Sequence, residues 1–380
     1  MIPLSLPHLA GNEWKYVKDC LDTGWVSSAG AYVTQFEEAV ANFAGAKYGV
    51  ACMNGTAALH LSMRLLGVER EDYVLVPNIT FIASINAIKY LGAHPILIDV
   101  DPDSWQMDVG LLETFLQEQT TLMDDGSRVL REDNQKIAAI MPVHVLGNMC
   151  EMDHLMQLAK RYNLPIVEDA TESLGSYYKG KHSGSFGNMG CFSFNGNKII
   201  TTGGGGVVVT DDEVLAKKAK HLTTQAKISP DEYIHDEVGY NYRLVNVLAA
   251  IGVAQMEQLP GIIAQKKKMD AYYRSELAGV GDIQFQEVAP EVDANCWLFT
   301  LRTERMRPLL QFLNEQEIQC RPFWMPMNQL PMFQNDYFYN IHNYSNQIYQ
   351  SSISIPSSGG LTDQELETVV KEIRRFYKTS

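Results

Sequence analysis

The chain has 380 residues, of which 46% are hydrophobic and 20% charged, and its formal net charge is −14. At roughly 100–200 residues per domain, this length predicts two or three domains with a large buried core. The acidic balance argues against nonspecific binding to nucleic acid or anionic membranes, although backbone amides can still bind a small anion.

Apolar runs and helical patterns alternate along the first two-thirds of the chain. Strands are predicted at 48–52, 73–76, 94–99, 137–143, 164–167, 190–194 and 206–210, and helices at 57–66, 81–91 and 152–162. The polar, acidic segment 118–135 is predicted to be a surface insertion. Repeated strand–helix alternation predicts an α/β fold with a mostly parallel sheet covered by helices.

The pattern changes at about residue 257. A large α/β domain is therefore predicted at 1–256, and a smaller α+β domain at 257–380. The second part contains a long polar helix at 265–277, a strand at 297–303, and helices at 307–314 and 361–377.

The remaining general features bear on the cell compartment. No apolar run is expected to approach the roughly 20 residues of a membrane helix, and the N-terminus lacks the basic and apolar regions of a signal peptide. The six cysteines form no CxxC pair, and most have apolar neighbours. We therefore expect reduced, mostly buried thiols in a cytoplasmic protein without a metal.

The run from Asn54 to Leu59 joins a predicted strand directly to a predicted helix. Such a junction directs free backbone N–H groups and the hydroxyl of Thr56 towards one point. That point suits a phosphate, helped by the helix dipole. Simple helix capping by Thr56 explains the same residues and stays an alternative.

Two further side chains follow predicted strands. Asp169 ends the strand that begins near 164, where ligands bind in open α/β sheets, and its carboxylate could pair with a protonated pyridine nitrogen. A helix cap or a surface acid is the alternative. Phe81 follows another strand and could stack on an aromatic ring, although most phenylalanines at such positions belong to the core.

A single lysine, Lys198, lies between two predicted strands in a turn-rich segment of small residues. Partial desolvation there favours the neutral amine that a Schiff-base lysine needs. The glycines at 203–206 do not form a phosphate-binding P-loop, because the lysine precedes them and no Gly-Lys-Ser/Thr ending follows. They are expected to form a tight turn into the next strand.

Together, these motifs make the chain similar to the DegT/DnrJ/EryC1 family of sugar aminotransferases. The resemblance covers nearly the whole length, and it rests on the runs Gly24–Ser28, Asn54–Leu59, Glu168–Ala170 and Gly239–Leu244 together with Ser193, Phe194 and Lys198. It implies the type I, aspartate-aminotransferase-like fold for enzymes that use pyridoxal 5′-phosphate (PLP). It also implies a homodimer whose subunits share their active sites.

The resemblance implies a role for each matching residue. Lys198 would form the Schiff base with PLP, and Asp169 would pair with the pyridine nitrogen. Phe81 would stack on the ring, and Glu172 would contact the ring hydroxyl. The phosphate would be held by Gly55, Thr56, Ala57 and Ser193, and by Asn241 of the neighbouring subunit.

The chain departs from the usual family pattern at three places. Asn195-Gly196 replaces a frequent His-Pro, Gly204 replaces a frequent Glu, and Glu172 replaces Gln or His. Because an ionised carboxylate would be repelled by a phenolate, we expect Glu172 to be protonated or to hold a water. These departures resemble the branch that aminates UDP-linked 4-keto-6-deoxy-N-acetylglucosamine for bacillosamine-type and legionaminic-acid-type surface sugars.

The resemblance thus implies transfer of the amino group of L-glutamate to a keto-sugar, with Lys198 as the base and pyridoxamine 5′-phosphate as the intermediate form of the cofactor. For each candidate substrate residue, a surface or packing role is an equal alternative. The candidates are Trp25, Ser27 and Ser28 near the sugar, Arg243 and Arg321 for the pyrophosphate, and Trp324 for the nucleotide. His144 is expected to anchor a loop.

Several other functions are alternatives to amination at C4. Amination at C3 of the sugar stays an alternative, and so does 3-dehydration, although dehydratase relatives carry His in place of the Schiff-base lysine. A noncatalytic regulator of this fold would need an added DNA-binding region, for which the chain has neither spare length nor a basic patch. No GxGxxG motif follows the first strand, which argues against a nicotinamide-dependent oxidoreductase.

Overall fold

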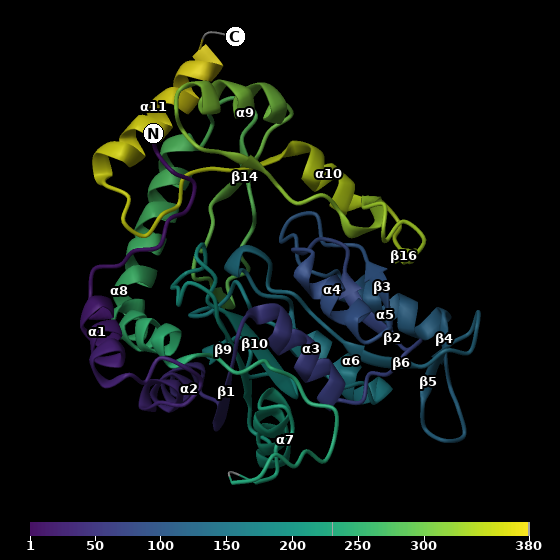
Figure 1. The fold of residues 1–380 in the computed structure, drawn as a ribbon. Helices are drawn as coiled ribbons and strands as arrows, with labels where there is room; N and C mark the ends of the chain where they lie inside the picture. The colour runs from purple at the N-terminus through teal and green to yellow at the C-terminus, as the bar shows by residue number, and fades with distance from the viewer. Residues whose placement is uncertain (230, 379–380) are drawn as a thin grey trace.

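The computed structural model describes residues 1–229 and 231–378. A large α/β part contains most of the chain, and a smaller α+β part lies above it in Figure 1. The long helix α8 (Asn246–Leu277) runs from one part to the other along one side.

One mostly parallel sheet forms the centre of the large part. Its strands are β1 (Tyr48–Cys52), β2 (Tyr73–Pro77), β3 (His94–Ile98), β6 (Ile137–Ile140), β7 (Val167–Asp169), β10 (Met189–Ser193), β11 (Gly206–Thr210) and β16 (Tyr337–Tyr339). The strand order is β1-β11-β10-β7 and β6-β2-β3-β16, and the two halves meet through parallel bridges from Ile140 to Ile166 and from Val143 to Asp169. Only β11 runs antiparallel to its neighbours. The predicted mostly parallel sheet is confirmed.

Helices cover both faces of this sheet, as expected for strands that are buried on both sides. They are α1 (Glu13–Thr23), α2 (Ala31–Ala44), α3 (Gly55–Leu65), α4 (Ala83–Tyr90), α5 (Val109–Glu118), α6 (Met152–Tyr162) and α7 (Glu213–Thr223). Aspartates cap two of them, since Asp108 accepts a hydrogen bond from the N–H of Leu111 and Asp212 accepts two from the first turn of α7.

The smaller part is an antiparallel sheet packed against helices. Its strands are β12 (Gln284–Phe285), β14 (Thr300–Arg302), β15 (Arg321–Pro322) and β17 (Ser352–Ser354), and its helices are α9 (Met306–Glu315), α10 (Tyr344–Ser351) and α11 (Asp363–Lys378). Side chains of α8, α9 and α11 form its core with Leu301 and Ile353.

Several segments contain elements that the sequence did not predict. The predicted insertion 118–135 contains a short hairpin of β4 (Thr120–Leu122) and β5 (Arg128–Leu130). Three further short strands, β8 (Tyr177–Tyr178), β9 (Lys181–His182) and β13 (Val292–Asp293), form a separate sheet. The predicted boundary at 256/257 falls inside α8, and β16 leaves the C-terminal part to pair with β3.

The expectation about apolar runs needs correction. Helix α8 includes an 18-residue window of mean hydropathy 1.4, so it is long and apolar enough to cross a membrane by length and composition alone. Glutamine and glutamate side chains interrupt this run in the sequence, which concealed it. Inside the protein 44% of the window is buried, and α8 packs against α1 and α2, as a core helix does.

The cysteines are free thiols. Five of the six are buried, and Cys296 is half-buried. The predicted burial of most thiols is confirmed.

Candidate active site

The N-terminus of α3 provides the first part of the site. Asn54, and not Thr56, caps this helix, and its side-chain oxygen accepts a 2.8 Å hydrogen bond from the N–H of Ala57. Within the described residues, the N–H groups of Gly55 and Thr56 donate to no protein acceptor. A helix N-terminus with free N–H groups attracts an anion.

Close packing explains the glycine at this corner. A Cβ atom built on Gly55 would lie 2.8 Å from the Cβ of Ser193 and 3.2 Å from the methyl carbon of Thr171. These distances are too short for a larger residue without a shift of its neighbours. Glycine therefore lets the end of β10 and the start of α3 approach each other, so that the Ser193 hydroxyl lies beside the free N–H groups.

Asp169 ends β7 as a buried, hydrogen-bonded carboxylate with only 2% of its surface exposed. One of its oxygens, Oδ2, accepts a 2.6 Å hydrogen bond from the Ser84 hydroxyl. The other, Oδ1, accepts from the N–H of Thr171 at 3.2 Å. Asp169 is thus not a surface acid, and its charge is held in place by a hydroxyl and a backbone amide.

Lys198 lies between a carboxyl group and an aromatic ring. Its side chain is 10% exposed, and its Nζ is 3.4 Å from Oε1 of Glu172. The same Nζ is 4.3 Å from the centre of the Trp297 ring. A lysine with so little exposure and only one carboxyl partner suits a chemical role better than a role in solubility.

Glu172 is buried beside this lysine. Its second oxygen, Oε2, accepts a 2.9 Å hydrogen bond from the N–H of Leu146. Burial raises the pKa of the Glu172 carboxyl above its ordinary value, and the charge of Asp169 adds to this rise, whereas Lys198 acts in the opposite direction. This direction agrees with the expectation that Glu172 binds a proton readily.

Aromatic side chains form another wall. Phe81 is 53% exposed, which rules out the core position considered as its alternative. Its ring centre lies 6.3 Å from that of Trp324 in an edge-to-face arrangement. The exposed Arg321 of β15 lies on the same wall, and no carboxylate in the described part of the chain pairs with it.

These groups surround one cavity of about 640 Å³, which we call the lysine cavity. The predicted residues that line it are Gly55, Thr56, Phe81, Glu172, Ser193, Lys198, Arg321 and Trp324. Asp169 adjoins it, because Thr171 and Glu172 belong to its lining. The sequence analysis gave no role to Asn54, Thr171 or Trp297, which also line this cavity. Of these three residues, only Asn54 had a signal in the sequence, because it belongs to the polar run that follows β1.

The other predicted residues lie elsewhere. Ala57 is buried outside the lining of the lysine cavity. Ser28, Asn241 and Arg243 line a second hollow of about 420 Å³, which we call the Asn241 hollow, and the buried Nε of Arg243 has no hydrogen-bond partner. Trp25 and Ser27 line neither, and Asn246 binds both of their backbone carbonyls at 2.7 Å.

His144 is fully buried and does not line the lysine cavity. Its Nε2 lies 3.1 Å from Glu168, and its Nδ1 lies 3.4 Å from the N–H of Cys150. Glu168 also accepts hydrogen bonds from the backbone of three residues at 184–187. These contacts are those of a histidine that anchors a loop.

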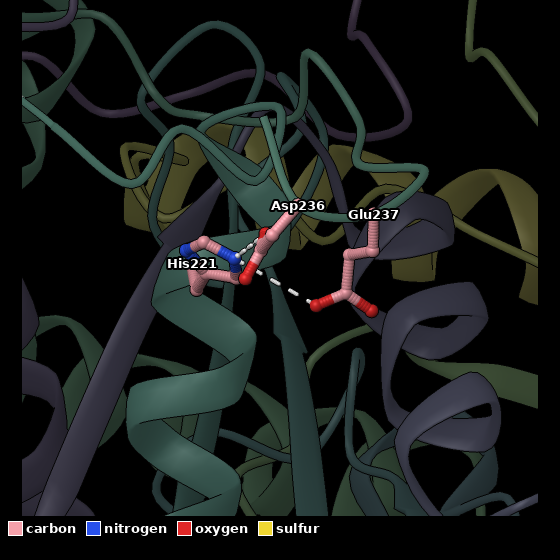
Figure 2. Close-up of side chains that lie close together, drawn as sticks. All are labelled: His221, Asp236 and Glu237. Atoms are coloured by element: carbon pink, nitrogen blue, oxygen red, sulfur yellow. Dashed lines mark hydrogen bonds and ion pairs between the residues drawn. The ribbon is translucent and has the colours of Figure 1, made fainter. Parts of the chain in front are cut away.

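A separate cluster of His221, Asp236 and Glu237 lies at the end of α7 (Figure 2). The His221 Nε2 is 2.7 Å from Asp236 and 3.7 Å from Glu237, and Lys218 also pairs with Glu237. Hydrogen bonding from His221 lowers the pKa of Asp236. The cluster is therefore a surface network in which Asp236 and Glu237 already have partners in His221 and Lys218.

The donor set of the lysine cavity suits PLP. The free N–H groups of Gly55 and Thr56 and the Ser193 hydroxyl fit a phosphate. The buried Asp169 carboxylate fits a protonated pyridine nitrogen, and the exposed face of Phe81 fits an aromatic ring. The amine of Lys198 fits an aldehyde.

The chain is similar to known proteins over nearly its whole length. The model of the DegT/DnrJ/EryC1/StrS aminotransferase family matches residues 7–374. GDP-perosamine synthase of Escherichia coli O157:H7 is 37% identical, covering 99% of this chain and 98% of its own. The putative pyridoxal phosphate-dependent aminotransferase EpsN of Bacillus subtilis is 36% identical, covering 100% of this chain and 96% of its own.

A solved structure has the same fold. DesV of S. venezuelae, in complex with a ketimine intermediate, has a TM-score of 0.86 and 28% sequence identity. The match covers 97% of this chain and 94% of that chain. The type I fold predicted from the sequence is therefore confirmed.

Proposed function

Because this chain belongs to the DegT/DnrJ/EryC1/StrS aminotransferase family, we propose that it transfers the amino group of L-glutamate to the C4 keto group of a nucleotide-linked 4-keto-6-deoxy sugar. The chain is a PLP-dependent sugar aminotransferase. The observation that supports our choice of site is the Lys198 amine, enclosed with Glu172 and close to the buried Asp169.

Binding of the cofactor falls to three groups of residues. Gly55, Thr56 and Ser193 hold the phosphate, and Phe81 stacks on the ring. Asp169 keeps a proton on the pyridine nitrogen, because its carboxylate is fixed by Ser84 and Thr171. When bound, PLP supplies an aldehyde that accepts amino groups and a ring that spreads negative charge.

Proton transfer falls to Lys198. Its Nζ takes the α-proton of the bound glutamate and later returns a proton to C4 of the sugar. Glu172 lies 3.4 Å away and holds or releases a proton beside this amine. Donor and sugar would occupy the same cavity in turn, which predicts ping-pong kinetics.

Binding of the sugar nucleotide uses the open side of the lysine cavity. Arg321, which has no carboxylate partner in the described residues, is suited to the pyrophosphate. Trp324 stands next to Phe81 and offers a flat face to the nucleotide base.

The Asn241 hollow supports a homodimer with shared sites. Ser28, Asn241 and Arg243 gather there, apart from the lining of the lysine cavity of the same chain. The unpaired, buried Nε of Arg243 is a donor that lacks an acceptor. In the proposed dimer, this hollow completes the lysine cavity of the partner, and Asn241 reaches its phosphate. Trp25 and Ser27 lie in the loop that leads to Ser28.

The identity of the nucleotide is the finer part of the proposal. The sequence departures at Glu172, Asn195-Gly196 and Gly204 favour a UDP-linked N-acetyl sugar, which would serve surface-glycan or glycoprotein synthesis. The relative named GDP-perosamine synthase supports a GDP-linked sugar as the second candidate. A panel assay with glutamate, PLP and UDP-, GDP- or dTDP-linked 4-keto sugars decides between them by product mass. Amination of 3-keto sugars alone would contradict the C4 assignment, and absence of 2-oxoglutarate would indicate 3-dehydration instead.

The lysine assignment has a direct test. Borohydride treatment of the holoenzyme fixes PLP to the lysine that binds it, and peptide mapping should find the adduct on Lys198. An adduct on another lysine would contradict the assignment. The matched variant Lys198→Ala should lose the visible absorbance band while still folding.

Subunit complementation tests the shared site. Lys198→Ala and Asn241→Ala homodimers should each be nearly inactive. Random mixing after co-refolding should restore about a quarter of the wild-type rate, because half of the dimers are hybrids with one intact site each. No recovery in a mixture that contains hybrids by mass spectrometry would contradict the shared site.

A further inference from the structure

Trp297 contacts Lys198 and has no role in the proposed function. It precedes β14, is 2% exposed, and lines the lysine cavity. The face of its indole ring lies 4.3 Å from the Lys198 Nζ. At this distance a cation is attracted by the electron-rich face of an indole, most strongly where water is excluded.

A second contact ties the same indole to the backbone beside the lysine. The Trp297 Nε1–H donates a 2.7 Å hydrogen bond to the carbonyl of Asn197, the residue that precedes Lys198. One side chain therefore contacts both the backbone and the amine of the lysine segment.

Trp297 is itself rigidly held. Its backbone N–H donates to Oδ1 of Asn295 at 2.9 Å. Its carbonyl accepts a 2.8 Å hydrogen bond from the buried Nζ of Lys266 on α8. These two hydrogen bonds fix the backbone of Trp297, and the bond from its indole N–H to Asn197 fixes the ring.

We propose that Trp297 is a positioning residue for Lys198, which holds the free ammonium group between the indole face and Glu172. This inference rests on the proposed role of Lys198. A transaminase lysine that is not bonded to the cofactor needs a defined place, from which it can return to the reacting carbon. The indole and Glu172 form that place at 4.3 Å and 3.4 Å from the nitrogen.

The test measures the lysine itself in the full-length apoprotein. Competitive acetylation over a range of pH, read by mass spectrometry of the Lys198 peptide, gives the pH at which half of the amines react. Removal of the indole disfavours the ammonium form, so this midpoint should fall by about 0.5–1 pH unit in Trp297→Leu. Trp297→Phe keeps a weaker aromatic face and should show about half of that fall.

Two controls separate positioning from packing. Trp324→Phe changes the tryptophan whose ring stacks on Trp297 with 6.5 Å between ring centres. Among the described residues the Lys198 amine lies over the Trp297 ring and not over that of Trp324, so this variant, which keeps an aromatic ring against Trp297, should leave the midpoint unchanged. Replacement of all five tryptophans by 5-fluorotryptophan keeps shape and N–H while weakening the ring face, and should lower the midpoint in the same direction. If Trp297→Leu does not fold, the protein that contains 5-fluorotryptophan still tests the proposal.

An unchanged midpoint in both Trp297→Phe and the fluorotryptophan protein would overturn the proposal. The outcome is distinguishable from failure of the proposed function. If borohydride mapping places PLP on another lysine, the catalytic role of Lys198 fails, whereas the acetylation result still reports whether Trp297 holds its amine.

Discussion

The buried lysine of α8 makes a measurable contribution to the pH dependence of stability. Lys266 is 3% exposed, and its Nζ donates to the carbonyls of Trp297 and Ser357. No carboxylate in the described residues pairs with it. Burial lowers the pKa of Lys266 from 10.5 to about 7, and only the nearby Cys296 acts against this shift.

The sign follows from the two protonation states. Between about pH 7 and 10.5 the unfolded chain binds a proton at this lysine that the folded chain has released. The free energy of unfolding therefore rises with pH in this range, by about 1.4 kcal/mol per pH unit. Between pH 7.5 and 9.5 the gain from Lys266 is about 2.5 kcal/mol.

The assay compares wild type with Lys266→Met by urea unfolding of the apoproteins at equal concentration and several pH values. Loss of the two hydrogen bonds shifts the stability of the variant by a constant amount, so the change of the difference with pH isolates the lysine. Wild type should gain about 2.5 kcal/mol relative to the variant from pH 7.5 to 9.5. A difference that stays flat would refute the reasoning. Lys268→Met removes an exposed lysine from the same helix and serves as the matched control.

Three further predictions concern the site and its support. Ser84→Ala removes the 2.6 Å hydrogen bond to Asp169. The affinity for PLP, measured by absorbance titration, should fall about tenfold, since hydrogen bonds to charged groups contribute about 1.5–3 kcal/mol. An unchanged affinity would show that Asp169 does not need this hydrogen bond. Gly55→Ala places a Cβ 2.8 Å from that of Ser193, so PLP binding should weaken more than tenfold while the circular dichroism spectrum stays nearly normal. Tight binding by this variant would argue against a phosphate site at the start of α3. Asp99→Ala removes the carboxylate that accepts hydrogen bonds from the N–H groups of Tyr344 and Ser345 at the start of α10, and the protein should lose about 1–3 kcal/mol in urea unfolding. The exposed Asp124→Ala is the comparison, and equal stability of the two variants would contradict this cap.

Local sequence patterns predicted the sheet and much of the site. Strands β1 and β11 appear at their predicted limits, because continuous apolar runs between turn residues are typical of strands buried on both faces. The strand ends placed Asp169 and Phe81 at the edge of the sheet where ligands bind. Their roles came from the family resemblance, because a cap or a core position explained each residue equally well.

Contacts distant in sequence could not be predicted in this way. Trp297 meets Lys198 from the other part of the protein, and no local pattern links positions so far apart. The first half of α8 was missed because Pro260 disfavours a helix interior, although packing against α1 and α2 stabilises it here. Strand β16 is only three residues long, and its pairing with β3 depends on the path of the whole chain.

The return of β16 to the large sheet limits how the protein can be divided. A fragment that stopped at 256 would lack β16 and would cut α8 within its length. The outer hydrogen-bonding groups of β3 would then face water along an apolar strand, which is a template for association with other chains. Truncated forms should therefore aggregate during expression, and the gene is better altered by point substitution than by removal of the C-terminal third.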